Sequence, residues 1–158
     1  MLPRKTCCFT GHRDLPKEGT QAYFDLRLCL LRAVRAAVAD GVTCFVSGGA
    51  RGFDLLAAET VLECKMIDAC VELRILVPYA GQPDRFPFAD KQRYRRILAE
   101  ATQVHVLSEH YYPGCMRARN ERLVLHADMC IAYLHKRAGG TLMTVNMAAK
   151  KGIPITYL

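Results

Sequence analysis

Short apolar runs alternate with longer amphipathic stretches along the whole chain, and this alternation limits the folds that the sequence can adopt. Six runs have the length and composition of β-strands: 6–11, 42–47, 70–79, 103–108, 129–134 and 154–158. Five intervening stretches have helical periodicity: about 20–39, 53–66, 89–101, 115–126 and 141–151. Strands that alternate with helices predict βαβ units. We therefore expect an α/β, three-layer, Rossmann-like doubly wound fold, with a mostly parallel sheet of about six strands and helices on both faces.

The length and charge of the chain bound its organisation and its partners. A chain of 158 residues without a linker-like or low-complexity run predicts one domain over 1–158. The first residues have too short an apolar run for a secretory signal, and arginines interrupt the longest apolar helical stretch, so we expect a cytoplasmic protein without a membrane span. The formal net charge of +7 favours anionic partners such as nucleotides, although the basic residues are spread along the chain.

The eight cysteines form no CxxC pair and no cluster with the spacing of a zinc site. Most of them fall in or beside apolar runs, so we interpret them as reduced thiols that fill space in the core, and we expect no metal site. The exception is Cys115, which lies in the loop-like segment YYPGCM and is predicted to be the most exposed thiol.

Three glycine-containing stretches come directly after predicted strands, at the edge where doubly wound sheets bind their ligands. The residues that they offer are Thr10, Gly11, His12 and Arg13; Ser47, Gly48, Gly49, Arg51, Gly52 and Asp54; and Gly139, Gly140 and Thr141. A strand-to-helix turn directs unpaired N–H groups toward a ligand, and glycine lets a phosphate approach the backbone. Arginine can hold a phosphate through two parallel hydrogen bonds. If the three stretches converge, they predict a phosphate-binding site; any one of them alone is equally typical of a plain tight turn.

Several residues near this edge are open to both a functional and a structural interpretation. Tyr79 ends a strand and could stack on a base or pack within a loop. Asp54 is either an ordinary stabiliser of a helix N-terminus or a contact for a ribose hydroxyl. His12 could donate to a phosphate or pack beneath the turn. His105 alternates with two valines, which favours a structural histidine with its hydrogen bonds satisfied.

Neither the P-loop pattern GxxxxGK[ST] nor a full GxGxxG occurs, which excludes an ordinary P-loop ATPase or NAD dehydrogenase. The segments that do stand out occur in a fixed order over nearly the full chain: TGHR (10–13), SGGARGFD (47–54), VPY…Q (77–82), RYRRIL (93–98), LSEHYYPGCMRARN (107–120), AD…IAY (127–133) and GGT (139–141). Together they resemble the SLOG superfamily, which joins the DprA (Smf) proteins to the LOG phosphoribohydrolases. Within it, the chain is similar to the bacterial DUF1273 family of YpsA- and YoqJ-like proteins.

The resemblance implies a Rossmann-like fold that binds a nucleotide or nucleotide-derived ligand, with Arg119 and Asn120 reaching over the crevice, and it implies dimers. It does not imply a reaction. The phosphoribohydrolases carry PGGxGTxxE, whose glutamate acts in catalysis, and the corresponding position here is Thr144. A second departure is Leu125, where the family usually has an aspartate.

These observations predict a nucleotide-sensing or nucleotide-binding module without strong catalysis, with no certain cofactor and no assigned catalytic residue. Two alternatives stay open. One is an N-glycoside hydrolase of nucleotides that uses a displaced carboxylate, for which Glu59, Asp54 and Glu121 are the candidates. The other is DprA-like binding of single-stranded DNA along a basic edge, which counterion release would make strongly dependent on salt.

Overall fold

Strands and helices alternate throughout the part of the chain that the computed structural model describes, residues 4–158; the first three residues of the predicted domain lie outside it. The elements are β1 (Lys5–Gly11), α1 (Gln21–Ala39), β2 (Val42–Ser47), α2 (Phe53–Ile67), β3 (Glu72–Val77), the 3-10 helix η1 (Gln82–Arg85), α3 (Phe88–Glu100), β4 (Gln103–Val106), α4 (Cys115–Leu125), β5 (Met129–Tyr133), α5 (Gly139–Lys151) and β6 (Ile155–Tyr157). The predicted α/β class is confirmed, and η1 is an addition within a loop that the sequence left irregular.

The strands form one sheet in the order β4-β3-β2-β1-β5-β6, and every neighbouring pair is parallel. From β1 the chain adds β2, β3 and β4 outward in one direction. It then returns across the sheet to place β5 on the other side of β1. The strand order therefore reverses between β1 and β5, and in an open parallel sheet such a reversal is where a ligand crevice forms.

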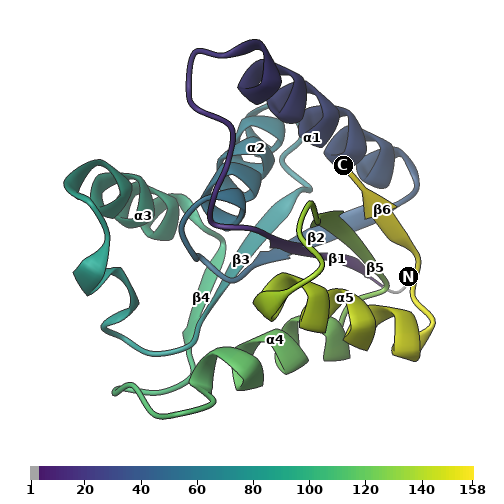
Figure 1. Ribbon diagram of the computed structural model, residues 1–158. Coiled ribbons are helices and arrows are strands. Elements are labelled where there is room, and N and C mark those ends of the chain that lie inside the picture. The colour runs from purple at the N-terminus through teal and green to yellow at the C-terminus, as the bar shows by residue number, and fades with distance from the viewer. Residues whose placement is uncertain (1–3) are drawn as a thin grey trace.

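The helices divide into two layers according to this topology. Right-handed crossovers place α1, α2 and α3 on one face of the sheet, while the reversal places α4 and α5 on the other face (Figure 1). The second face of the sheet is covered by only two helices, whereas the first face is covered by three. The sheet is thus unevenly protected, and β4 at its edge is exposed along its length.

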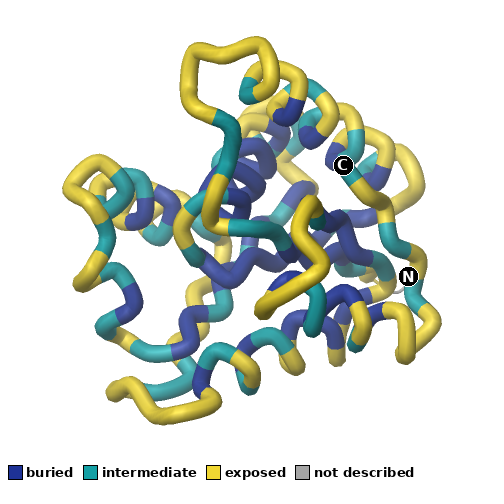
Figure 2. Tube along the Cα trace, in the orientation of Figure 1, coloured by how far each residue is buried: buried dark blue, intermediate teal, exposed yellow. Residues whose placement is uncertain are grey.

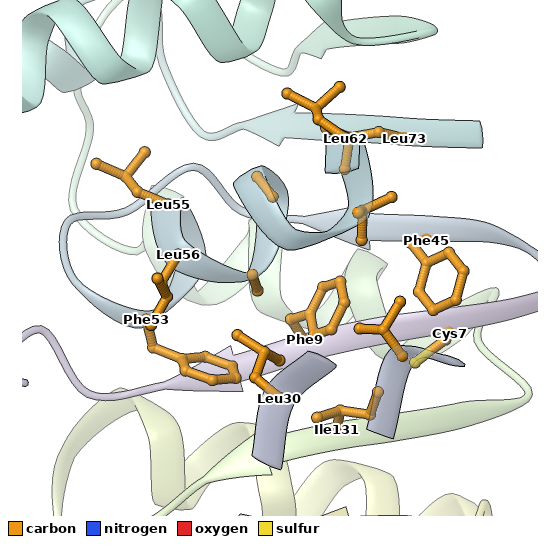
Figure 3. Close-up of a cluster of buried hydrophobic side chains, with 14 of the residues drawn as sticks. Cys7, Phe9, Leu30, Phe45, Phe53, Leu55, Leu56, Leu62, Leu73 and Ile131 are labelled. Atoms are coloured by element: carbon orange, nitrogen blue, oxygen red, sulfur yellow. The ribbon is translucent and has the colours of Figure 1, made fainter. Parts of the chain in front are cut away.

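The core lies mainly between the sheet and the α1–α3 layer, where the burial in Figure 2 is densest. Three phenylalanines stand at its centre: the rings of Phe9 and Phe45 stack with centroids 5.9 Å apart, and Phe53 meets Phe9 edge-on at 6.3 Å (Figure 3). Leu30 of α1 and Ile131 of β5 belong to the same cluster and lie beside Phe9. A smaller cluster under α4 and α5 completes the second face.

One sequence expectation about burial is wrong. Cys115 is not an exposed thiol but only 1% exposed, because as the first residue of α4 it lies against the inner side of that helix near Arg119. His105 lies on the edge strand β4, none of whose residues is buried, and its Nε2 is 3.4 Å from Gln103 Oε1. The exposed thiols are those of Cys29 and Cys70, and all eight cysteines are free.

Residues 4–158 contain no group of three His, Cys, Asp or Glu side chains arranged to hold a metal ion. Among the helices of the same residues, none has both the length and the apolar composition required to cross a bilayer.

Candidate functional site

A cavity of about 280 Å³ lies at the point where the strand order reverses, and all three glycine-containing stretches contribute to it. Its walls come from the end of β1, the loop before α2, one side of α4 and the first turn of α5. The lining residues are Phe9, Thr10, Gly11, His12, Arg13, Ala50, Asp54, Met116, Arg119, Asn120, Leu123, Ala138, Gly139, Gly140 and Thr141. The structure therefore brings together residues that are separated by more than a hundred positions in the sequence.

Six of the sequence-derived candidates do not line this cavity: Ser47, Gly48, Gly49, Arg51, Gly52 and Tyr79. The Arg51 side chain turns away and donates from Nε to Asp90 of α3 at 3.1 Å. The Tyr79 ring meets Tyr111 edge-on at 5.5 Å, within a loop cluster outside the cavity. Neither side chain is in a position to contact a molecule held between β1 and α5.

Two N–H groups of the turn between β2 and α2 bond within the turn itself. The Gly49 N–H donates to Ser47 Oγ at 3.3 Å, and the Ala50 N–H donates to Asp54 Oδ2 at 3.3 Å. Ser47 Oγ in turn donates to the Asp54 carbonyl at 2.9 Å. The turn contributes Ala50 and Asp54 to the wall of the cavity.

Two glycines permit close packing between this turn and the loop after β1. At Gly52, where φ is +78°, an added Cβ would overlap with the carbonyl of Arg13. At Gly11, an added Cβ would overlap with the Phe53 ring. Phe53 also donates its N–H to the His12 carbonyl at 3.1 Å. These glycines set the distance between two walls of the cavity.

A buried arginine and a buried aspartate form the electrostatic centre of the site. Arg119 is only 5% exposed; its Nη1 donates to the Gly48 carbonyl and its Nε donates to Asn120 Oδ1 at 2.8 Å. Asp54, 6% exposed, lies beside it. Burial raises the pKa of Asp54 to about 6, against the opposing effects of Arg119, the Ala50 N–H and Arg13. Burial lowers the pKa of Arg119, and Asp54 counteracts that effect.

The first turn of α5 is the open wall of the cavity. Gly139 has φ +80° and no atom within 4 Å of the place where a Cβ would stand. Within the described chain, no side chain caps this N-terminus. The Thr10 and Thr141 hydroxyls, which also line the cavity, make no hydrogen bond within residues 4–158. This wall therefore presents unpaired donors together with the positive end of the helix dipole.

His12 and Arg13 complete the rim. The Lys136 N–H donates to His12 Nε2 at 3.0 Å, which leaves the proton of the neutral ring on Nδ1. Burial, with nearby His135 and Lys136, lowers the pKa of His12 and so favours the neutral ring. Arg13 is exposed and makes no hydrogen bond or ion pair within residues 4–158. It is a cation at the cavity mouth that lacks an anion.

Two supporting residues were not identified as such from the sequence. Gln82 donates from Nε2 to the Gly48 carbonyl at 3.1 Å, and Tyr94 donates from its hydroxyl to Gln82 Oε1 at 3.2 Å. Burial raises the pKa of Tyr94 to about 12, so the phenol remains a donor. Both lie within segments of the family resemblance, VPY…Q and RYRRIL, which was the available signal. Through these contacts Gln82 and Tyr94 support the β2–α2 turn, and neither residue lines the cavity.

Two of the three carboxylates considered for hydrolysis lie elsewhere. Glu59 pairs with Arg93 in the groove between helices, and Glu121 pairs with Arg117 on the outer side of α4 at 3.1 Å. At the position of the phosphoribohydrolase glutamate, the Thr144 hydroxyl donates to the Gly140 carbonyl at 2.9 Å. Asp54 is the one carboxylate among the residues that line the cavity.

The raised pKa of Asp54 has a measurable effect on stability. The ordinary value is 3.8 and the folded value is about 6, so folding favours the protonated form. The associated stability is present below pH 4 and is lost as the pH rises through 6. We predict that Asp54→Asn becomes more stable relative to the wild type across this window, by about 3 kcal/mol in total. Urea unfolding of both proteins between pH 4 and pH 8 measures the difference, and a difference that stays constant with pH would contradict the prediction.

The all-parallel doubly wound sheet, with a cavity at its switch point, defines a Rossmann-like α/β protein. The chain belongs to the YspA SLOG family, whose sequence model matches residues 7–154. A UPF0398 protein of Halalkalibacterium halodurans is 28% identical over 121 residues, 75% of this chain and 64% of that protein. A UPF0398 protein of Bacillus thuringiensis is 26% identical over 130 residues, 80% of this chain and 71% of that protein. The match thus spans only about two thirds of the length of these curated relatives.

Two solved structures share the fold, and both are DNA processing protein A. The Helicobacter pylori protein, described with a single-stranded DNA binding mode, superposes with a TM-score of 0.67 at 18% identity over 97% of this chain and 64% of that chain. The Streptococcus pneumoniae protein gives a TM-score of 0.67 at 22% identity over 98% of this chain and 50% of that chain. At these identities the likeness establishes the fold.

Proposed function

We propose that this protein binds the phosphate of a nucleotide or nucleotide-derived molecule in the cavity at the switch point, and that it acts in the cytoplasm as a binding or sensing module rather than as a strong catalyst. One observation carries the proposal. The uncapped first turn of α5 faces, across one cavity, the unpaired guanidinium of Arg13 and the buried Arg119 with its half-buried partner Asn120.

Each wall supplies a different part of the recognition. The α5 turn offers N–H groups and the Thr141 hydroxyl to phosphate oxygens, as helix N-termini do for anions. Arg13 balances the charge from the rim, and His12 can add its Nδ1–H. The volume lies near the lower end of the range for ligand pockets, which favours a mononucleotide over a dinucleotide.

The test is a thermal-shift and calorimetric screen against mono-, di- and cyclic nucleotides and NAD derivatives. We predict that Arg13→Ala weakens binding of the nucleotide found by about tenfold or more, because a charge-assisted hydrogen bond contributes about 1.5–3 kcal/mol. The matched control is Arg51→Ala. That arginine also adjoins a glycine turn, but it pairs with Asp90 outside the cavity, so its loss should leave the affinity unchanged.

Two results would count against the proposal. The first is the absence of any thermal shift, because ligand at 100 times its dissociation constant should stabilise the fold by about 2.7 kcal/mol. The second is an equal loss of affinity in both arginine variants, which would indicate a diffuse charge effect instead of a site.

Hydrolysis of an N-glycosidic bond is the second candidate, and the position of Asp54 favours it. A carboxylic acid with a pKa of about 6 inside a ligand cavity is suited to proton transfer near neutral pH. Incubation with nucleotides followed by chromatography for the free base tests it directly. Release of base that Asp54→Asn abolishes would establish the enzyme; no release at high protein concentration would remove this candidate.

Binding of single-stranded DNA is the third candidate, supported by the fold shared with the Helicobacter pylori protein. Phosphate contacts release counterions, so such binding should weaken steeply with salt. Binding of a labelled oligonucleotide in dilute salt that Arg13→Ala weakens would favour DNA at the same cavity.

A further inference from the structure

A second groove lies on the opposite side of α4 from the cavity, where two helices leave part of the sheet uncovered. It measures about 540 Å³ and runs between α4 and the edge strand β4. Its floor is apolar, formed by Val46 of β2, Leu76 of β3 and Leu123 of α4. Leu123 also lines the cavity, so α4 is the wall that separates the two sites.

The polar residues of this groove are basic or neutral, and none of the described residues that line it is acidic. Arg74 comes from β3, His105 from β4, and Arg122 and His126 from the end of α4. Arg74 Nη2 donates to Glu72 at 3.2 Å, but its Nε is buried and has no partner within residues 4–158. A buried donor without an acceptor is unusual, and this one is free to bind a water molecule or another acceptor. The groove is therefore matched to a negatively charged molecule.

The strand that borders the groove is itself open to pairing. β4 is the edge of the sheet, and its four residues carry no aspartate, glutamate, lysine, arginine or proline. Such residues are the usual protection of an edge strand against other strands. Val104 and Val106 are 37% and 51% exposed, and they pair with Ile75 and Val77, whose side chains belong to the core on the α1–α3 face. His105 pairs with Leu76 and so faces the groove.

We propose that β4 is a docking strand for an extended, acidic segment of a partner protein. The partner's backbone would pair with the open edge of β4, which is the β-augmentation mode of recognition. Because side chains alternate along a strand, one set would place carboxylates over the groove, near His105, Arg74 and Arg122. The other set would cover the exposed valines with apolar side chains.

The unpaired backbone groups of β4 distinguish between the three kinds of molecule that could bind at this groove: a nucleic acid, a second copy of this chain and an acidic polypeptide. A nucleic acid would meet the basic groups but would leave the edge N–H and C=O groups unpaired. A second copy of this chain could pair β4 with β4, but that strand carries no acidic residue to place over the groove. An acidic polypeptide strand satisfies both features.

The experiment measures fluorescence anisotropy with a labelled peptide of alternating glutamate and valine, roughly eight residues long. We expect binding that Arg122→Glu weakens by at least about tenfold, since a like charge would then face the peptide. Arg122 is exposed, so the variant should keep its fold. The matched control is Arg96→Glu, an exposed arginine of α3 on the other helix layer, which should leave the affinity unchanged.

Two further probes separate backbone pairing from simple charge attraction. The same peptide with methyl groups on alternate backbone nitrogens keeps its charge but cannot pair with an edge strand, and it should bind at least about tenfold more weakly, by the loss of several hydrogen bonds. No binding of the parent peptide at about 1 mM, or equal binding of the methylated one, would overturn the proposal.

Two other outcomes would assign the groove to another occupant and would also overturn it. One is a dimer in solution that Val106→Lys dissociates. The other is a thymidine oligonucleotide that binds more tightly than the peptide and is lost in Arg122→Glu. Arg13→Ala should not alter peptide binding, so this test is independent of the nucleotide proposal.

Discussion

Gly52→Ala should lower the free energy of unfolding by about 3 kcal/mol or more, because two separate costs apply at that position. The backbone has φ +78° and ψ −118°, a conformation that residues with a Cβ rarely adopt. The new Cβ would also overlap with the Arg13 carbonyl, which belongs to backbone and cannot turn aside. Equilibrium unfolding in urea measures the loss, and the same shift in the β1 loop should weaken ligand binding at the cavity.

Gly152→Ala is the matched control for this prediction. Gly152 ends α5 with φ +80° in the left-handed region, but nothing lies within 4 Å of the place where its Cβ would stand. Only the backbone cost applies there, so the expected loss is about 1 kcal/mol. Equal losses at the two positions would mean that contact between the two loops contributes nothing, and that Gly52 is an ordinary turn glycine.

The fold could be predicted from the sequence because each element carries its own local signal. Asp40 and Gly41 end α1 where the sequence indicates, and Gly41 takes φ +94°. The alternation of strands and helices then leaves few topologies, since parallel strands need right-handed crossovers. The convergence of the three glycine-containing stretches follows from the same rule, because the carboxyl ends of parallel strands share one edge.

The roles of individual residues at that edge could not be predicted, because they depend on contacts between distant segments. Arg13 and Arg51 look alike in sequence, each beside a glycine turn. One lines the cavity without a partner, and the other pairs with Asp90 of α3. Asp54 has the sequence position of a helix-capping residue, yet it is buried beside Arg119, a neighbour from 65 positions further along the chain.

The exposure of the edge strand could not be predicted from the sequence for a similar reason. The alternation of Val104, His105 and Val106 is the same for a covered strand and for an uncovered one. What differs is the place of the strand in the sheet: β4 is an edge strand, and Val104 and Val106 are exposed although they face the α1–α3 layer. That place is a property of the topology and is not visible in the local sequence.

Arg119→Met should lower the free energy of unfolding by about 2–3 kcal/mol near pH 8, a loss limited by the cost of protonating Asp54, whose pKa is about 6. The substitution removes the buried cation beside Asp54, and a buried charge without a partner is strongly destabilising. The loss is electrostatic rather than a loss of support for the β2–α2 turn, because the Gly48 carbonyl keeps its hydrogen bond from Gln82. Arg117→Met, a change at an exposed neighbour on the same helix, should cost at most about 0.5 kcal/mol.

The double variant Asp54→Asn/Arg119→Met distinguishes this electrostatic cause from a packing defect. Once the carboxylate is replaced, no buried charge needs the arginine, so the double variant should be more stable than Arg119→Met alone, with a coupling of about 1–3 kcal/mol. A packing defect would instead give additive losses, and the coupling would vanish. Wild-type Arg119 lines the cavity and is held by the Gly48 carbonyl and Asn120, so its charge is already fixed in place for the anionic ligand that we propose. If the coupling is found, the site retains at neutral pH a buried carboxylate whose replacement would stabilise the fold, which is the kind of cost that proteins accept where a ligand is bound.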